Sequence, residues 1–289
     1  MWGRRRNQGG IKHVEKSLGK QIWSILSPLV LRYAIAYIVE IVIISVFTVM
    51  KYPGVFNGLE TQEQIYEQLA VILEAVLPYS TQMGTVAAAI TIPFLVRLMK
   101  KDNLQPEIQE FSAVKYIYAT VMSVAVAVGL NNILLLVDIA KFSESYQESA
   151  ELLYSPSFWV QILCLGIVYP TMEELLFRGV IYRRIRKNTA TFNAIISSAL
   201  FFGVYHGNSV QMIYGALCGI MLAYFCEKSG DVRLPIFAHM AMNIISVILT
   251  EFDAFEWMFA VPTRMVIITI LCAAVGSSML VLIRQKEIS

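Results

Sequence analysis

Long apolar runs separated by short charged clusters constrain this chain more than any other feature. A helix needs ~20 apolar residues to cross the hydrocarbon of a bilayer, and eight runs come near this length. They cover residues 26–50, 80–99, 116–140, 157–182, 190–206, 209–226, 234–250 and 258–283. Only 15% of the residues are charged, against roughly a quarter in a soluble domain. The sequence therefore predicts an all-α fold, a polytopic membrane helical bundle of about eight transmembrane helices.

The basic residues predict how this bundle is oriented. Of the 23 lysines and arginines, 18 fall in segments or span ends that a cytosolic N-terminus places inside. Three fall outside (Lys51, Lys141 and Arg264), and Arg32 and Arg178 lie within spans. Because lysine and arginine gather on the cytoplasmic side, both chain ends are expected in the cytosol, N-in and C-in. A net charge of only +2 gives no case for nucleic acid, and the lipid bilayer is the expected partner of the basic clusters.

The distribution of polar residues divides the chain into four parts. We expect a basic cytosolic segment over residues 1–25, scaffold transmembrane helices over 26–150, a catalytic helical core over 151–250, and a final transmembrane helix with a short cytosolic tail over 251–289. The core begins near a predicted acidic loop, 141–156. The spans before this loop carry few polar groups, whereas the residues suited to catalysis follow it.

Two adjacent glutamates, Glu173 and Glu174, lie inside an apolar stretch. Ionisable groups at membrane depth are costly and signal a working site. Neighbours on a helix point in different directions, whereas Glu174 and Arg178, four residues apart, share a face in the order that favours an ion pair. The pattern predicts that Glu174 pairs with Arg178 while Glu173 points into a cavity, where it can take a proton from water. A purely structural ion pair is the alternative.

Two of the three histidines also lie in apolar runs with a partner four residues away. His206 follows Phe202, and Asn243 follows His239. A lone membrane histidine often forms just an interhelical hydrogen bond, but two such pairs favour a shared site. At 1.5 Å per residue, Glu173 and His206 reach ~21 and ~26 Å above the predicted inner turn. His239 joins them if the fourth and fifth helices project about 10 Å into the cytosol, which places the site in the inner half of the bilayer.

Three motifs together resemble the Abi/CAAX-protease (CPBP) family of intramembrane endopeptidases, the group that includes the Ras-converting CAAX endopeptidase. They are Glu173-Glu174-x-x-x-Arg178, Phe202-x-x-x-His206 and His239-x-x-x-Asn243. Each lies on its own predicted span, and the resemblance covers about residues 157–250. What it implies is peptide-bond hydrolysis inside the membrane by an all-helical protein.

The resemblance also implies roles for the motif residues. Glu173 would activate water with help from His206. His239 and Asn243 would hold the developing oxyanion, which neutral donors stabilise best where water is excluded. Arg178 would fix Glu174 and shape the site from behind.

A metal-free glutamate mechanism is the favoured interpretation, so no cofactor is expected. Two histidines and a glutamate could bind zinc with an open fourth position, and this alternative stays open. Against it, the chain has no His-Glu-x-x-His motif, and asparagine is an unusual zinc ligand.

No motif in the sequence identifies the substrate. The resemblance suggests a prenylated CAAX tail, or more broadly a membrane-embedded or lipid-anchored peptide reached from the cytosolic side, in a multi-pass protein of a prokaryotic plasma membrane. A non-catalytic scaffold or bacteriocin-immunity protein on the same fold is one alternative. A proton-coupled transporter is another, but it would usually show repeated halves.

Overall fold

A computed structural model of the protein describes residues 8–103, 112–137 and 143–285, with side chains from residue 19 onward. Within these ranges the fold is helical and contains no strand, which confirms the predicted all-α class. The long helices are α1 (Gln8–Lys51), α2 (Gln62–Val76), α3 (Ser80–Lys101), α4 (Ala113–Leu136), α9 (Thr191–Tyr205), α10 (Ser209–Ser229), α11 (Arg233–Glu251) and α13 (Pro262–Arg284). Arg4, Arg5, Arg6, Lys141 and Lys286, which the orientation prediction counts, lie outside the described residues.

Seven helical segments of the described chain are long and apolar enough to cross a membrane, so the protein is a multi-pass integral membrane protein. They are Gly19–Lys51, Gln62–Lys101, Ala113–Leu136, Phe158–Arg186, Ser209–Ser229, Arg233–Glu251 and Pro262–Arg284. The remaining predicted span, 190–206, corresponds to α9, which has 15 residues and is ~22 Å long. The count of eight and the N-in, C-in orientation stay predictions.

The span Phe158–Arg186 is not a uniform α-helix. Its pieces are α6 (Phe158–Gln161), η3 (Ile162–Val168), α7 (Tyr169–Glu174), η4 (Leu175–Tyr182) and α8 (Arg183–Arg186). In η3 and η4 the helix widens to turns whose hydrogen bonds reach five residues instead of four, a rare geometry found mostly at functional sites. The short α7, which carries both glutamates, is thus framed by two widened segments.

The hairpin of α9 and α10 packs closely because small residues face each other. A Cβ on Gly203 would lie 2.5 Å from the main-chain oxygen of Met212, and one on Gly219 would lie 3.1 Å from the Cα of Ala199. Small residues four apart on both helices let two backbones approach in this way in membrane proteins. The close approach places the main chain of α10 within reach of the span that carries the glutamates.

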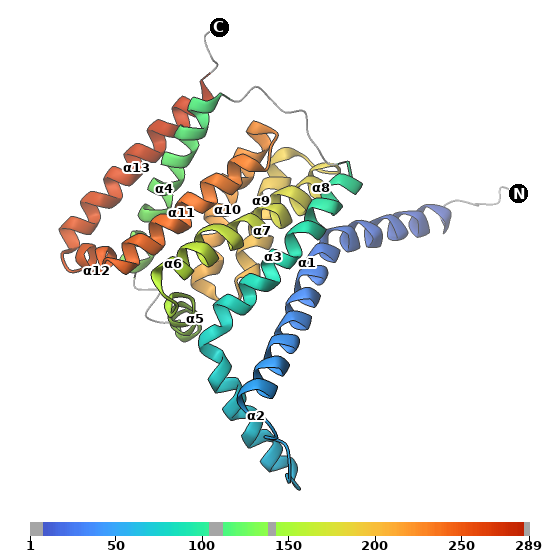
Figure 1. Ribbon diagram of the computed structural model, residues 1–289. Helices are drawn as coiled ribbons and strands as arrows, with labels where there is room; N and C mark the ends of the chain where they lie inside the picture. The colour runs from blue at the N-terminus through green and yellow to red at the C-terminus, as the bar shows by residue number, and fades with distance from the viewer. Residues whose placement is uncertain (1–7, 104–111, 138–142, 286–289) are drawn as a thin grey trace, which may run out of the picture.

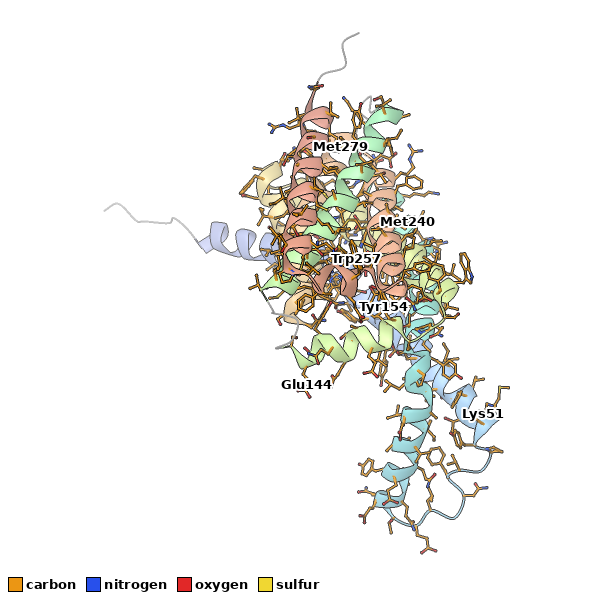
Figure 2. The ribbon with its side chains drawn as sticks, turned by 90° about the vertical axis from the view of Figure 1, so that its left-hand side faces the viewer. Lys51, Glu144, Tyr154, Met240, Trp257 and Met279 are labelled. Carbon is orange, nitrogen blue, oxygen red and sulfur yellow. The ribbon has the colours of Figure 1, made fainter. Side chains whose placement is uncertain are left out.

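The predicted acidic loop 141–156 is instead largely a helix, α5 (Glu144–Tyr154), which lies across one end of the bundle (Figure 2). The prediction was wrong because apolar residues of this segment pack on the bundle, an effect that its acidic composition conceals. Thr81 donates from Oγ1 to the Leu152 carbonyl (3.0 Å), and Gln161 donates from Nε2 to the carbonyls of Tyr154 (3.0 Å) and Pro156 (2.7 Å). These bonds tie α5 to α3 and α6.

Two further features complete the arrangement. The C-terminal part of α1 and α2 project beyond the bundle as a hairpin, with Ile72 and Val76 packed against Phe47 (Figure 1). At the opposite side α13 runs along α4, and the short α12 (Ala254–Phe259) connects α11 to α13. Of these elements, α1, α4 and α12 contribute Tyr33, Asn131 and Phe255 to the cavity described below.

Candidate active site

The predicted ion pair of the second glutamate is present and fully buried. Arg178 donates from Nη1 to Oε1 of Glu174 at 2.7 Å, and both side chains are 0% exposed. The second guanidinium nitrogen, Nη2, donates to the Gly219 carbonyl of α10 at 3.0 Å, and the guanidinium lies 4.5 Å from the ring centroid of Phe202. These contacts offset part of the cost of burying two charges, while Glu174 Oε2 and Arg178 Nε have no hydrogen-bond partner among the described residues.

The imidazole of His239 also binds Glu174, a contact that the sequence did not predict. Its Nδ1 lies 2.9 Å from Glu174 Oε1, and its Nε2 lies 3.8 Å from Oε2 of Glu173. Because a carboxylate held by Arg178 is an acceptor only, Nδ1 carries the hydrogen and donates it. His239 is therefore oriented by one glutamate and presents its other nitrogen towards the next.

Glu173 faces a cavity, as predicted. The cavity has a volume of about 740 Å³, and its wall includes Glu173, His206, His239 and Asn243, whereas Glu174 and Arg178 do not line it. Glu173 is 7% exposed, and its position on α7 turns it away from the Glu174–Arg178 pair. Four of the six candidate residues thus meet at one cavity, and the other two support them from behind.

His206 stands at the end of α9 with its ring orientation fixed. Its Nδ1 lies 2.8 Å from the Phe202 carbonyl, which can only accept, so Nδ1 carries the hydrogen and Nε2 is a free acceptor. Gly207, with a φ of +80°, turns the chain into α10, whose first turn is capped by Asn208. The ring of Phe202 contacts both imidazoles edge to face, at 4.9 Å from His206 and 5.6 Å from His239. Phe202 therefore packs between the two histidines.

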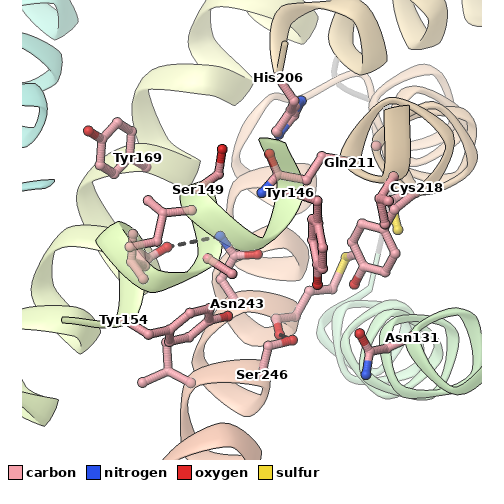
Figure 3. A pocket seen from close by; sticks show the side chains of 18 of the residues that line it. Asn131, Tyr146, Ser149, Tyr154, Tyr169, His206, Gln211, Cys218, Asn243 and Ser246 are labelled. Atoms are coloured by element: carbon pink, nitrogen blue, oxygen red, sulfur yellow. Dashed lines mark hydrogen bonds between the residues drawn. The ribbon is translucent and has the colours of Figure 1, made fainter. Parts of the chain in front are cut away.

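The amide of Asn243 forms a hydrogen bond with the main chain of the widened helix η3. Asn243 donates from Nδ2 to the Leu165 carbonyl at 2.9 Å, the dashed line in Figure 3. In η3 the N–H of Tyr169 bonds to Cys164, and the next residue that could serve Leu165 is Pro170, which has no N–H. Asn243 supplies the missing donor, and its second amide hydrogen is left for the cavity.

The cavity continues from Glu173 to α5, and its far end is lined by neutral polar groups (Figure 3). They include Tyr146, Ser149, Tyr154, Asn131 and Ser246. Burial raises the pKa of Tyr146 and, with Tyr146 nearby, that of Tyr154, so both phenols stay neutral. Among the described residues, no charged side chain lines this end of the cavity.

The direction of the cavity bears on two predictions. The cavity is lined by residues of both predicted parts, the scaffold 26–150 and the core 151–250. Tyr33, Ser80 and Thr81 come from the scaffold, so the cavity wall is not confined to the predicted core. The helix ends around α5 are those that the N-in topology places outside. Access from the inner side stays a prediction, and the course of the cavity does not favour it.

The sequence reasoning missed residues beside the cavity. Arg32 of α1 is 6% exposed and lies next to Tyr169 and Tyr205, which line the cavity with Glu173. The signal was available, because an arginine within an apolar span is as costly as a glutamate.

In the part of the chain that the structure describes, no three His, Cys, Asp or Glu side chains come together as metal ligands. His239 contacts Glu173 through Nε2 and Glu174 through Nδ1, but these three described side chains do not form a group that could hold a metal ion. The residues present do not make the zinc site that the sequence left open, so no chemical step is assigned to a metal.

The site of this multi-pass helical membrane protein is a cavity lined by a glutamate and two histidines. Residues 155–245 match the family model described as type II CAAX prenyl endopeptidase Rce1-like, and this segment holds all six candidate residues. The match covers about a third of the chain and agrees with the family that its three motifs resemble.

A curated relative agrees with this assignment. "Putative membrane peptidase YdiL" of Bacillus subtilis (strain 168) is 30% identical over 90 residues, which span 31% of this chain and 37% of the relative. No solved structure matches the chain. Because little more than a third of the relative is covered, substrate and activity are matters for proposal.

Proposed function

We propose that this protein is an intramembrane endopeptidase that hydrolyses a peptide bond in a membrane-embedded or lipid-anchored peptide, with Glu173 activating the water. One observation carries the proposal. The carboxylate of Glu173 faces the cavity beside His239, 3.8 Å from its Nε2, whereas the neighbouring Glu174 is held by Arg178 and His239. Two carboxylates thus have different surroundings and different roles.

In this mechanism Glu173 is the general base. It takes a proton from water, and the oxygen of that water bonds to the carbonyl carbon of the peptide. His206 is suited to orient the water, because its Nδ1–H is bonded to Phe202 and its Nε2 can accept from the cavity side. When the C–N bond breaks, the proton on Glu173 passes to the leaving nitrogen, which yields a carboxylate and an amine.

The oxyanion of the intermediate needs donors on the cavity wall. Asn243 has one amide hydrogen beyond the bond to Leu165, and His239 offers Nε2–H only when its ring carries both protons. Glu174 is the negative charge that such a ring would face. Donors held in place by other bonds lose no energy to reorganisation as the charge develops.

A lipid-anchored peptide is the favoured substrate class. The matched family is described as a prenyl endopeptidase, and the neutral side chains described at the far end of the cavity suit an apolar or neutral segment. A bacterial relative supports a prokaryotic plasma membrane as the location.

The test compares wild type with Glu173→Gln in the native cell by quantitative mapping of peptide ends. The reconstituted proteins are then given a farnesylated, internally quenched peptide that ends in Cys-aliphatic-aliphatic-Met, and the same peptide without the lipid. The proposal expects peptide ends that depend on Glu173 and persistence of cleavage after metal chelation. If the cellular phenotype survives in Glu173→Gln and no ends change, the protein is a scaffold or immunity protein. Loss of cleavage with chelator, restored by zinc, would reject the metal-free mechanism.

A further inference from the structure

Helix α1 touches the bundle sparingly, yet it buries an arginine. Among its residues 19–51, only Pro28 and Arg32 are buried. Ile25 and Leu29 on the same side of the helix pack partly against the central core. Arg32 lies on the same face of α1 as these two residues. An apolar side chain could be buried there without the desolvation penalty that a charged group has. A charge in this place needs a reason.

The neighbours of Arg32 are two tyrosines of the cavity wall. The ring of Tyr33, the next residue on α1, packs 5.8 Å from that of Tyr205, and the guanidinium charge acts on the hydroxyls of Tyr205 and Tyr169. Arg32 Nε and Nη1 find no hydrogen-bond partner among the described residues. Arg32 does not line the cavity itself, so it stands behind the two tyrosines, which do.

Both tyrosines are held in place. The Tyr205 ring packs 5.3 Å from Phe177 and 5.8 Å from Tyr33, centroid to centroid. The Tyr169 hydroxyl fits against Gly84 of α3, where any Cβ would collide with it. Because the rings cannot turn freely, the position of Arg32 relative to the cavity is set by packing.

Arg32 adds a second buried arginine to a site that holds two buried glutamates. Glu174 is offset by Arg178, with which it forms a direct ion pair. Glu173 is left over, and within the described ion pairs its partner is His239 at 3.8 Å. The charges of Arg32 and Glu173 both act on the hydroxyls of Tyr169 and Tyr205, and these two tyrosines line the cavity with Glu173. At low dielectric such charges interact over longer distances than in water.

We propose that Arg32 is a positioning residue of the active site, which acts through Tyr205 and places the positive charge that offsets Glu173 behind the cavity wall. Helix α1 then belongs to the active site instead of serving as a membrane anchor alone. The inference rests on the proposed peptidase function and adds to it a residue outside the matched segment 155–245.

The experiment measures kcat and KM for cleavage of the farnesylated quenched peptide by the full-length protein in lipid vesicles. Arg32→Met should lower kcat about tenfold or more with little change in KM, since it removes a charge and no substrate contact. Arg32→Lys should recover most of the loss because it keeps the charge. Arg97→Met, at an exposed position of α3, is the matched control and should behave as wild type.

A second pair of variants separates the proposal from a folding effect. Tyr205→Phe keeps the ring contacts and deletes the hydroxyl, and it should lower kcat as well. If Arg32 acts through Tyr205, the double variant Arg32→Met/Tyr205→Phe is no slower than Arg32→Met alone. Additive losses, or a Lys variant as slow as Met at unchanged thermal stability, would overturn the proposal. Unchanged kcat in Arg32→Met overturns it while the peptidase stands, whereas a wild type that cleaves neither peptide and changes no ends in cells overturns both.

Discussion

The imidazole of His239 donates from Nδ1 to the same carboxylate oxygen of Glu174 that binds Arg178, at 2.9 Å and 2.7 Å. One buried glutamate thereby joins three spans, because Arg178 also bonds to the Gly219 carbonyl of α10. The arrangement fixes the orientation and the tautomer of the histidine, as carboxylates do behind other functional imidazoles. Glu174 thus orients His239 and Arg178, and Glu173 lies beside the His239 imidazole.

Glu174→Gln tests this organising role. The amide keeps the shape but removes the charge, so Arg178 and His239 lose the negative charge that they share at low dielectric. Breaking a buried ion pair from one side costs about 3 kcal/mol or more, and cleavage should fall with it. Thermal unfolding in detergent and the peptide assay measure both effects. Glu148→Gln, exposed on α5, is the control, and a Glu174 variant equal to it in both assays would show that the pair does not organise the site.

Glu173→Gln and His206→Ala test the chemical step. The first replaces the base by a neutral amide, the second removes the imidazole, and both leave the Glu174–Arg178 pair untouched. Loss of a general base lowers the rate by roughly a hundredfold or more, so cleavage should be nearly abolished. Both proteins should remain folded by gel filtration and melting. Substantial residual cleavage in both variants would reject the assigned base.

Gly219→Ala tests the close packing of α9 and α10. The new Cβ would lie 3.1 Å from the Cα of Ala199 and 3.2 Å from Nη2 of Arg178, so either the hairpin opens or the guanidinium moves. Overpacking of this kind costs about 1–3 kcal/mol, and activity should fall because Arg178 is displaced. Gly276→Ala is the matched control, since its Cβ meets Val126 at an ordinary 3.7 Å. Equal melting temperatures for the two variants would contradict the packing argument.

The sequence predicted those parts of the structure that depend on spacing within one helix. Apolar length gave the spans, and the four-residue step gave the Glu174–Arg178 pair. It could not give the bond from His239 to Glu174, because the rotation of one helix against another is a tertiary property. The helix α5 was missed for the same reason, since its acidic residues face outward and only the bundle shows which side is covered. Arg32 was missed although its cost in a span was as plain as that of Glu173.

The bond from Asn243 to Leu165 is a consequence of Pro170. Tyr169 donates to Cys164 in the widened turn, and Pro170 has no N–H, so the Leu165 carbonyl has no main-chain donor and Asn243 serves it at 2.9 Å. Asn243→Ala should therefore leave a buried carbonyl without a partner, at a cost of about 1–3 kcal/mol. Asn243→Asp should be no better, since its carboxylate offers no donor.

Pro170→Ala provides the matched background for this prediction, because alanine restores an N–H at the position from which the Leu165 carbonyl can be reached. In a double-mutant cycle followed by thermal unfolding, Asn243→Ala should be clearly destabilising with Pro170 present and much less so in the Pro170→Ala background. Peptide cleavage should stay low in both backgrounds if the remaining amide hydrogen of Asn243 serves the oxyanion, because the new N–H repairs the backbone alone. Full recovery of cleavage in the double variant would show that Asn243 serves only the main chain of η3. Equal destabilisation in both backgrounds would show instead that the proline is not the reason for the asparagine.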